Sequence, residues 1–222
     1  LPRQLRWNPL ISIRGGCQEG VASRYPYVGW MIGRVTMAKY LDDVSQGEPA
    51  ALRPADAAAA RGWAVDPKGR KLAVGFDFHG NLHYGSPVQT TGEQIVTMVS
   101  DRVSDEYLAE LKEAGVGVVT VPPDGHEFEH ALKILPHDYG DGIWMLEGGG
   151  KINAAFLQAG LINEISTIVC PALDATRDNP SIYQALDPAA RPAQNVSLRL
   201  KKAEPLQGGA VWLNYDVLPA RR

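Results

Sequence analysis

Hydrophobic positions in the middle of the chain follow two alternating patterns. Short continuous apolar runs, which predict buried strands, are separated by segments whose apolar residues recur with the period of a helix. The predicted strands are Ile95–Val99, Val116–Val121, Ile143–Leu146 and Ile165–Val169, and the predicted helices run from Ser104 to Gly115, from about His126 to Leu135, and over Ile152–Ala159. Because the strands are apolar throughout and alternate with helices, they indicate a parallel sheet covered on both faces.

The C-terminal segment has a different period. Apolar residues alternate with polar ones in two rows that flank Gly208-Gly209: Val196, Leu198 and Leu200 before it, and Val211, Leu213, Tyr215 and Val217 after it. Two alternating rows joined by a glycine turn predict an antiparallel hairpin. We therefore expect an α/β fold with a mostly parallel central sheet, flanking helices and a C-terminal antiparallel hairpin.

One stretch interrupts this order. Residues Ser45–Arg70 are rich in Ala and Pro, and Asp56 can cap a short helix over Ala57–Ala60 before Gly62. The patterns on both sides of the stretch fit one sheet. We therefore interpret residues 1–222 as a single domain and residues 45–70 as a surface insertion within it.

Charge and composition narrow the class of partner. The chain has 222 residues, with 22 Lys and Arg against 25 Asp and Glu and a net charge of −3, which argues against binding to nucleic-acid phosphates. The longest apolar runs, such as Tyr27–Ile32, are far shorter than the roughly 18 residues of a membrane span, and no signal-peptide segment is evident. We expect a cytoplasmic protein that binds a small molecule and neither nucleic acid nor membrane.

The most informative motif is Glu147-Gly148-Gly149-Gly150, which lies between a predicted buried strand and a predicted helix. Backbone N–H groups that no side chain covers, at the positive end of a helix dipole, suit a phosphate or diphosphate. The alternative is an ordinary tight turn between strand and helix. A Walker A loop is excluded, because Ile152 stands where that motif requires Ser or Thr.

A second motif, Gly33-Arg34-Val35-Thr36, follows the apolar run Tyr27–Ile32 and precedes a short helical pattern over Met37–Leu41. Thr36 is suited to capping that helix. The guanidinium of Arg34 is suited to bidentate contact with a phosphate. The alternative is a capped helix with an arginine on the protein surface.

The segment His126-Glu127-Phe128-Glu129-His130 matches the H-E-x-x-H zinc pattern. The apolar residues Phe128, Ala131 and Leu132 define the buried face of this predicted helix, and both histidines fall on the opposite side. Because no third ligand is evident, we expect no metal. A metal-dependent hydrolase therefore ranks below the functions considered next.

In combination, the motifs resemble the reductase domain of the RibD type, which has the dihydrofolate-reductase-like fold. The resemblance runs from about Tyr27 to Val217 and rests on the order and spacing of five segments: Met31-Ile32-Gly33-Arg34-Val35-Thr36-Met37, Val103-Ser104-Asp105-Glu106-Tyr107-Leu108, Leu146-Glu147-Gly148-Gly149-Gly150, Asn163-Glu164-Ile165-Ser166 and Glu204-Pro205-Leu206. It implies a reductase that takes hydride from NADPH, and a homodimer. In bacterial members of the family the substrate is a ribosylaminopyrimidine phosphate of riboflavin synthesis, as in 5-amino-6-(5-phosphoribosylamino)uracil reductase.

The resemblance also assigns roles to individual residues. Glu147 matches the carboxylate that faces the substrate pocket and is the expected catalytic residue. The residues that match the two cofactor loops and the diphosphate-binding turn are Gly33, Arg34, Thr36, Ser100, Gly148, Gly149 and Gly150.

The N-terminal segment departs from the family pattern. Where family members carry Ser-Leu-Asp-Gly, this chain has Ser12-Ile13-Arg14-Gly15. The stretch Ser45–Arg70 replaces a loop near the substrate in the family, and Asp42 and Asp43 are expected to stand near the acidic residues missing from that loop. Arginine has only hydrogen-bond donors, so Arg14 favours an acidic or carbonyl-rich partner. We therefore expect Ser12, Arg14 and Asp42 to bind substrate, and the riboflavin-pathway pyrimidine to be a poor substrate. The alternative is that this short segment is aligned differently and Arg14 lies outside the site.

Two functions of different classes stay open. One is an NADPH-dependent reductase for a small heterocyclic or nucleotide-like substrate. The other is a nucleotide-binding protein of the same fold with little or no turnover. Hydride transfer needs a pocket that orients the substrate, and the segment around Arg14 that should supply it has changed.

Overall fold

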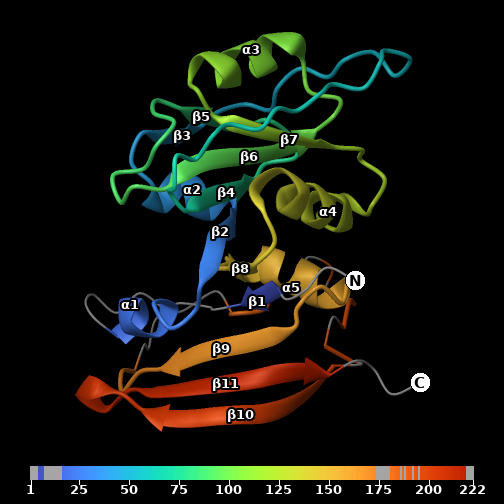
Figure 1. Ribbon diagram of the computed structural model, residues 1–222. Helices are drawn as coiled ribbons and strands as arrows, with labels where there is room; N and C mark the ends of the chain where they lie inside the picture. The colour runs from blue at the N-terminus through green and yellow to red at the C-terminus, as the bar shows by residue number, and fades with distance from the viewer. Residues whose placement is uncertain are drawn as a thin grey trace. The chain divides into compact units, whose positions relative to one another are not determined.

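The computed structural model in Figure 1 describes residues 5–7, 17–173, 181–185, 187, 189–191, 193–194 and 196–218. Ser12 and Arg14 lie outside the described residues. The chain divides into two compact units. The first comprises Leu1–Pro2 and Val28–Asp141, and the second comprises Arg3–Tyr27 and Gly142–Arg222.

The first unit is built on parallel strands in the order β2-β4-β6-β7: β2 (Tyr27–Gly33), β4 (Leu72–Phe76), β6 (Gln94–Ser100) and β7 (Gly117–Val121). Every residue of β4 and β6 is buried, as expected for strands covered on both faces. The remaining elements are α2 (Arg34–Tyr40), α3 (Asp105–Glu113), α4 (Glu127–Tyr139) and a small antiparallel sheet of β3 (Val44–Gln46) and β5 (Leu82–Tyr84). Figure 1 shows α3 and α4 on opposite sides of the parallel strands.

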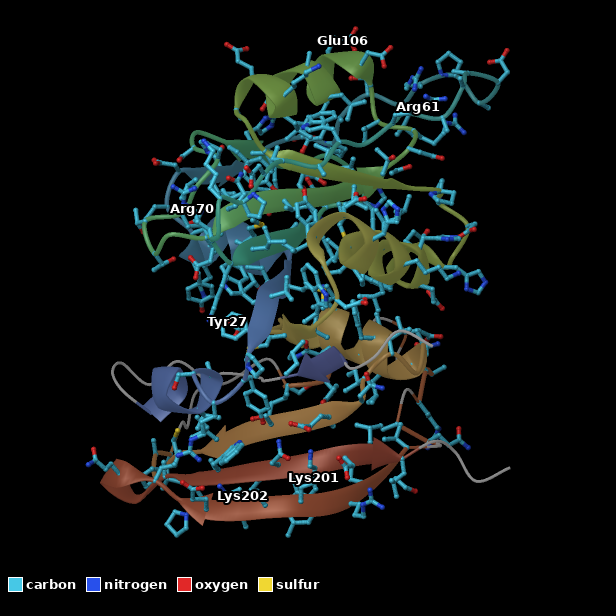
Figure 2. All side chains as sticks on the ribbon, in the orientation of Figure 1. Tyr27, Arg61, Arg70, Glu106, Lys201 and Lys202 are labelled. Carbon is cyan, nitrogen blue, oxygen red and sulfur yellow. The ribbon has the colours of Figure 1, made fainter. Side chains whose placement is uncertain are left out.

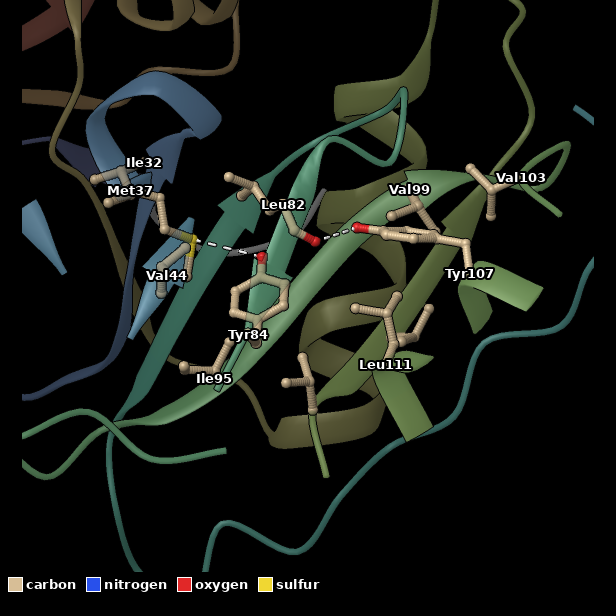
Figure 3. Close-up of a cluster of buried hydrophobic side chains, with 12 residues drawn as sticks. Ile32, Met37, Val44, Leu82, Tyr84, Ile95, Val99, Val103, Tyr107 and Leu111 are labelled. Atoms are coloured by element: carbon tan, nitrogen blue, oxygen red, sulfur yellow. Dashed lines mark hydrogen bonds between the residues drawn. The ribbon is translucent and has the colours of Figure 1, made fainter. Parts of the chain in front are cut away.

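The two faces of this sheet have different cores. On one face α2, α3 and the small sheet enclose the cluster drawn in Figure 3, which includes Ile32, Met37, Val44, Leu82, Tyr84, Ile95, Val99, Val103, Tyr107 and Leu111. The hydroxyl of Tyr107 donates to the carbonyl of Leu82 at 2.7 Å, so its polar end is satisfied within the core. On the other face the aromatic rings of Phe76, Phe78 and Phe128 meet edge to face, with centroids 5.4 to 5.9 Å apart. Because Phe128 belongs to α4, these contacts fix α4 against β4.

The observed helix ends can be compared with the capping residues predicted from the sequence. Ser104 caps α3 as predicted, because its Oγ accepts a hydrogen bond from the N–H of Tyr107 at 3.3 Å, and Gly115 ends the helix with a φ of 73°. The predicted cap at Thr36 is wrong. Helix α2 begins at Arg34, directly after β2, and its N-cap residue is Gly33. Thr36 therefore lies inside the first turn rather than before it.

Residues 45–70 contain no helix, so the predicted helix over Ala57–Ala60 is wrong. Trp63 instead pairs with Val118 on the outer edge of β7, with N–H to O distances of 2.8 and 2.9 Å, and its indole donates to the carbonyl of Val116 at 2.9 Å. Gly62 permits this approach, since a Cβ there would lie 2.2 Å from the carbonyl oxygen of Val118. A run of four alanines is too short to offset the cost of helix nucleation, and pairing with the sheet replaces it.

The second unit has the strand order β10-β11-β9-β1-β8: β1 (Leu5–Trp7), β8 (Ile143–Leu146), β9 (Glu164–Val169), β10 (Ser197–Pro205) and β11 (Val211–Leu218). Strand β1 is parallel to β8 and β9, whereas β11 is antiparallel to both β9 and β10. Helices α1 (Cys17–Ala22) and α5 (Gly150–Gln158) complete the unit. Gly208 and Gly209 turn the chain between β10 and β11 with φ of 72° and 80°, which confirms the predicted hairpin. The predicted mostly parallel α/β fold is confirmed as well.

Candidate functional site

The parallel strands of the first unit bring three polar residues to one edge. Gly33 at the end of β2 pairs with Phe76 at the end of β4, so Arg34 and Asp77 follow directly from neighbouring positions. Ser100 ends the next strand, β6. In open α/β sheets, ligands bind outside the carboxyl ends of the strands. Arg34 and Asp77, which follow β2 and β4, and Ser100, which ends β6, therefore lie at the ends of three adjacent strands, at the edge where a ligand is expected.

Arg34 contributes the positive charge of this edge. It is the first residue of α2 and is half-buried, and Gly33 before it has an extended conformation with φ −75°. Thr36, also half-buried, follows in the same turn. The structure therefore places the first predicted cofactor loop, Gly33 to Thr36, at the carboxyl edge.

Asp77 is fully buried at the centre of the edge, with 0% of its surface exposed. Its Oδ2 accepts hydrogen bonds from the N–H of Leu82 at 2.7 Å and from the hydroxyl of Tyr107 at 3.4 Å, whereas its Oδ1 is buried with no hydrogen bond. Burial raises the pKa of the Asp77 carboxyl, while backbone amides of the following turn and the charge of Arg34 oppose the rise. Sequence reasoning missed this residue, and its only signal was an aspartate directly after the apolar run Leu72–Phe76.

Ser100 is 6% exposed and closes the turn that leaves β6. Its N–H donates to the carbonyl of Phe78 at 3.1 Å, and its Oγ accepts from the N–H of Arg102, also at 3.1 Å. The guanidinium of Arg102 donates to the carbonyl of Arg53 at 2.7 Å. The bond to Phe78 ties the turns after β4 and β6 together, so the predicted second cofactor residue is held at the same edge as Asp77.

Asp42 lies elsewhere in the first unit. It follows α2, is exposed, and its Oδ2 accepts a hydrogen bond from the hydroxyl of Thr90 at 2.7 Å. Thr90 belongs to the loop that leads into β6, whereas Ser100 stands at the other end of that strand. The structure therefore does not bring Asp42 to the edge that carries Arg34 and Ser100.

The glycine turn of the second unit joins β8 to α5 as predicted. Glu147 is half-buried, Gly148 is buried with φ 97°, and Gly149 is the exposed N-cap of α5 with φ −68°. The peptide bond between Gly148 and Gly149 is cis. The turn therefore places an exposed glycine, Gly149, directly before the first N–H groups of α5.

Gly150 has a different environment from Gly149, because residues 181–184 cover it. Its carbonyl accepts a hydrogen bond from the N–H of Gln184 at 2.9 Å, and a Cβ at this position would lie 2.2 Å from the carbonyl oxygen of Ser181. The side chain of Asn153, buried on the first turn of α5, donates to the carbonyl of Ile182 at 2.8 Å. Of the three glycines, Gly150 is thus needed for packing, whereas Gly149 is exposed.

The histidines of the H-E-x-x-H pattern lie at the start of α4. His126 is 69% exposed, and Nε2 of His130 lies 2.9 Å from a carboxylate oxygen of Asp124. This hydrogen bond lowers the pKa of Asp124. Within the described residues, no group of three or more His, Cys, Asp or Glu side chains has an arrangement that would hold a metal ion. In that same part of the chain, no helix has the length and apolar character needed to cross a membrane.

Comparison with known proteins decides the family. Residues 65–212, two thirds of the 222 residues, match the model of the RibD C-terminal domain. The chain belongs to the RibD C-terminal domain family. The predicted resemblance is thereby confirmed. No curated protein matches the sequence.

Solved structures show that the fold is shared with other RibD-type proteins. A pyrimidine reductase-like protein from Corynebacterium diphtheriae superposes with a TM-score of 0.66 at 15% identity, covering 97% of this chain and 92% of the other. RibD from Acinetobacter baumannii gives 0.58 at 16% identity, and this chain, covered over 98% of its length, spans 58% of that protein. The riboflavin biosynthesis reductase Rib7 from Saccharomyces cerevisiae gives 0.54 at 13% identity, with coverage of 97% and 89%. The predicted dihydrofolate-reductase-like fold is confirmed.

Some of the candidate site residues lie inside the segment that matches the RibD C-terminal domain, and others lie before it. Asp77, Ser100 and the Glu147–Gly150 turn lie inside residues 65–212, whereas Arg34 and its loop precede them. The turn and the ends of β4 and β6 are thus part of the family's own region. The contribution of Arg34 depends on the strand register that places it beside Asp77.

Proposed function

We propose that this member of the RibD C-terminal domain family is an NADPH-dependent reductase that transfers hydride to a small heterocyclic or nucleotide-like substrate. The family match over residues 65–212 carries the proposal, because it includes both the end of β6 and the glycine turn. The related structures are described as pyrimidine and riboflavin biosynthesis reductases, which supports the class of substrate. In this proposal the 222 residues function as one reductase domain.

The residues present fit a dinucleotide phosphate. Gly149, which is exposed, stands directly before α5, and the first N–H groups of a helix have no partner within the helix and favour an anion. Arg34 offers a half-buried guanidinium at a second helix start. In the proposal Gly148 to Gly150 bind the diphosphate, and Arg34 with Thr36 and Ser100 bind the adenosine portion with its 2′-phosphate.

The reacting end of the site depends on Glu147. NADPH, when bound, would supply the hydride. Glu147 follows β8 directly and is half-buried, so the strand and the glycine turn restrict where its carboxylate can point. We assign to it the role of orienting the substrate by accepting hydrogen bonds from its donor groups.

Binding and turnover are tested separately. Quenching of tryptophan fluorescence on addition of NADPH measures binding, and loss of NADPH with candidate heterocycles measures reduction. The proposal predicts both. Binding without turnover on any substrate would favour the alternative, a nucleotide-binding protein of the same fold, and absence of binding would contradict both.

Arg34→Ala is expected to lower the preference for NADPH over NADH by about tenfold, because a charge-assisted contact to the 2′-phosphate is lost and NADH lacks that group. The dissociation constants of both cofactors, measured by calorimetry, give the ratio. Arg70→Ala is the matched control, since Arg70 is exposed and lies before β4 rather than after it (Figure 2). If the ratio of the two dissociation constants in Arg34→Ala equals that of the wild type, another residue binds the 2′-phosphate.

A homodimer remains part of the proposal. One face of the β9-β11-β10 sheet carries exposed apolar residues: Val169 is 50% exposed, Leu198 47% and Leu200 54%. Such a row on neighbouring strands gains stability when a second surface covers it. Sedimentation is expected to show twice the 24.1 kDa mass of one chain, and Leu198→Glu to shift the protein toward the monomer. A wild-type monomer at high micromolar concentration would contradict this.

A further inference from the structure

We propose that Asp77, in its ionised form, sets the cofactor preference of the reductase as a negative charge beside Arg34, which weakens binding of the 2′-phosphate of NADPH and leaves binding of NADH unchanged. The inference rests on the proposed function. It makes Asp77 a specificity-determining residue that acts through its electric field, without touching the cofactor.

The strand register places the two charges together. Gly33 and Phe76 are paired Cα positions on the parallel strands β2 and β4, and Arg34 and Asp77 are the residues that follow them. Adjacent strands lie about 4.8 Å apart, so the two side chains start from neighbouring points of the edge. Among the described residues, Arg34 forms no direct ion pair with Asp77, which leaves the guanidinium able to bind an anion. The positive charge of Arg34 nevertheless acts on the Asp77 carboxyl, opposing the rise of its pKa on burial.

Burial makes the Asp77 charge effective at a distance. The side chain is 0% exposed, so water does not screen it as it would a surface carboxylate. The N–H of Leu82 and the hydroxyl of Tyr107 donate to Oδ2, and Oδ1 has no hydrogen bond. The backbone amides of Leu82 and Asn81 offset only part of the cost of burying the charge. A dianionic 2′-phosphate that binds Arg34 therefore meets a poorly screened negative charge on the neighbouring strand. NADH carries no group at that position.

Asp77→Asn tests this directly. The amide oxygen of asparagine can accept from Leu82 and Tyr107 as Oδ2 does, and the NH₂ group replaces the oxygen that lacks a partner, so the shape is kept and the charge is lost. We expect the dissociation constant for NADPH to fall about fivefold to tenfold, and that for NADH to stay within about twofold of the wild type. Calorimetric titration of each cofactor at pH 8 measures both values without any substrate. Raising the salt concentration should reduce the difference between variant and wild type.

Tyr107→Phe is the control for a purely structural role. It removes the hydroxyl that donates to Leu82 and Asp77 but keeps the carboxylate, so the ratio of NADPH to NADH affinity should equal that of the wild type. If Asp77→Asn does not fold, Asp77→Ser, which keeps an acceptor and also lacks the charge, is measured in its place. A gain of affinity for one cofactor alone is not the result of a damaged fold.

The results of these titrations distinguish a failure of this inference from a failure of the proposed reductase function. The inference is overturned, and the proposed function stands, if the wild type binds both cofactors but Asp77→Asn or Asp77→Ser leaves the ratio of NADPH to NADH affinity unchanged or lower. A wild type that binds neither cofactor overturns both. The inference is also overturned if Tyr107→Phe raises the ratio of NADPH to NADH affinity as much as Asp77→Asn does. The effect would then follow from the hydrogen bonds and not from the charge.

Discussion

Gly149→Val is expected to lower the affinity for NADPH by about 100-fold or more while the protein stays folded. Gly149 is exposed, and its φ of −68° lies in a region that any residue adopts, so the backbone accepts a side chain there. The isopropyl group would stand in front of the first N–H groups of α5 and keep a diphosphate from approaching them. Calorimetric titration measures the affinity, and thermal unfolding measures the stability.

Two glycines of the same unit serve as controls for this exchange. Gly20→Val places the same side chain on α1, at an exposed position where no heavy atom lies within 4 Å of a new Cβ, and should leave both affinity and stability near those of the wild type. Gly150→Val drives a Cβ toward the carbonyl of Ser181 and should lower the stability. Equal affinity in the wild type and Gly149→Val would remove the glycine turn from the cofactor site.

Glu147→Gln is expected to lower kcat by about 100-fold and to leave the dissociation constant of NADPH within about twofold. Glutamine keeps the size of the side chain but loses the charge and one of the acceptor oxygens that orient the substrate. The comparison of turnover with calorimetric binding therefore separates a role toward the substrate from one toward the cofactor.

Glu106→Gln is the matched control for the loss of a carboxylate. Glu106, labelled in Figure 2, is an exposed residue in the first turn of α3. Its pKa is lowered chiefly because its carboxylate accepts a hydrogen bond from its own backbone N–H. Glutamine is accepted at such a position of a capped helix. Turnover should be unchanged. A kcat for Glu147→Gln equal to that of Glu106→Gln would contradict the role of Glu147.

Elements with a clear period or a local signal were predictable from the sequence. The helix after Ser104 and the hairpin around Gly208-Gly209 follow from residues close together in the chain, and both are present. The pairing of Trp63 with β7 joins residues far apart in sequence, and the N–H of Ala60, at the end of the predicted helix, donates to the distant carbonyl of Asp101. Strand β1 has three residues, too few for a hydrophobic period to show.

Part of the candidate site was likewise predictable from local sequence signals, and part depends on contacts between residues far apart in the chain. The strand, glycine turn and helix at residues 143–158 carry their own signal, and the structure has them in that order. The place of Asp77 between Arg34 and Ser100 depends on the register of β2, β4 and β6, which no local pattern contains. Nor does the sequence distinguish Gly149 from Gly150, because the difference comes from residues 181–184, which pack on one and leave the other exposed.

Transfer of deuterium from labelled NADPH to an organic product tests the central claim most directly. The substrates are the ribosylaminopyrimidine phosphate of riboflavin synthesis and a panel of acidic or carbonyl-rich heterocycles, and mass spectrometry of the products gives the result. Reductase function predicts that deuterium enters the reduced form of at least one heterocycle, with the pyrimidine phosphate a poor substrate because of Arg14 and faster in Arg14→Asp. A folded protein that binds NADPH yet transfers deuterium to no member of the panel, in either form, would contradict the assignment of this chain as a reductase.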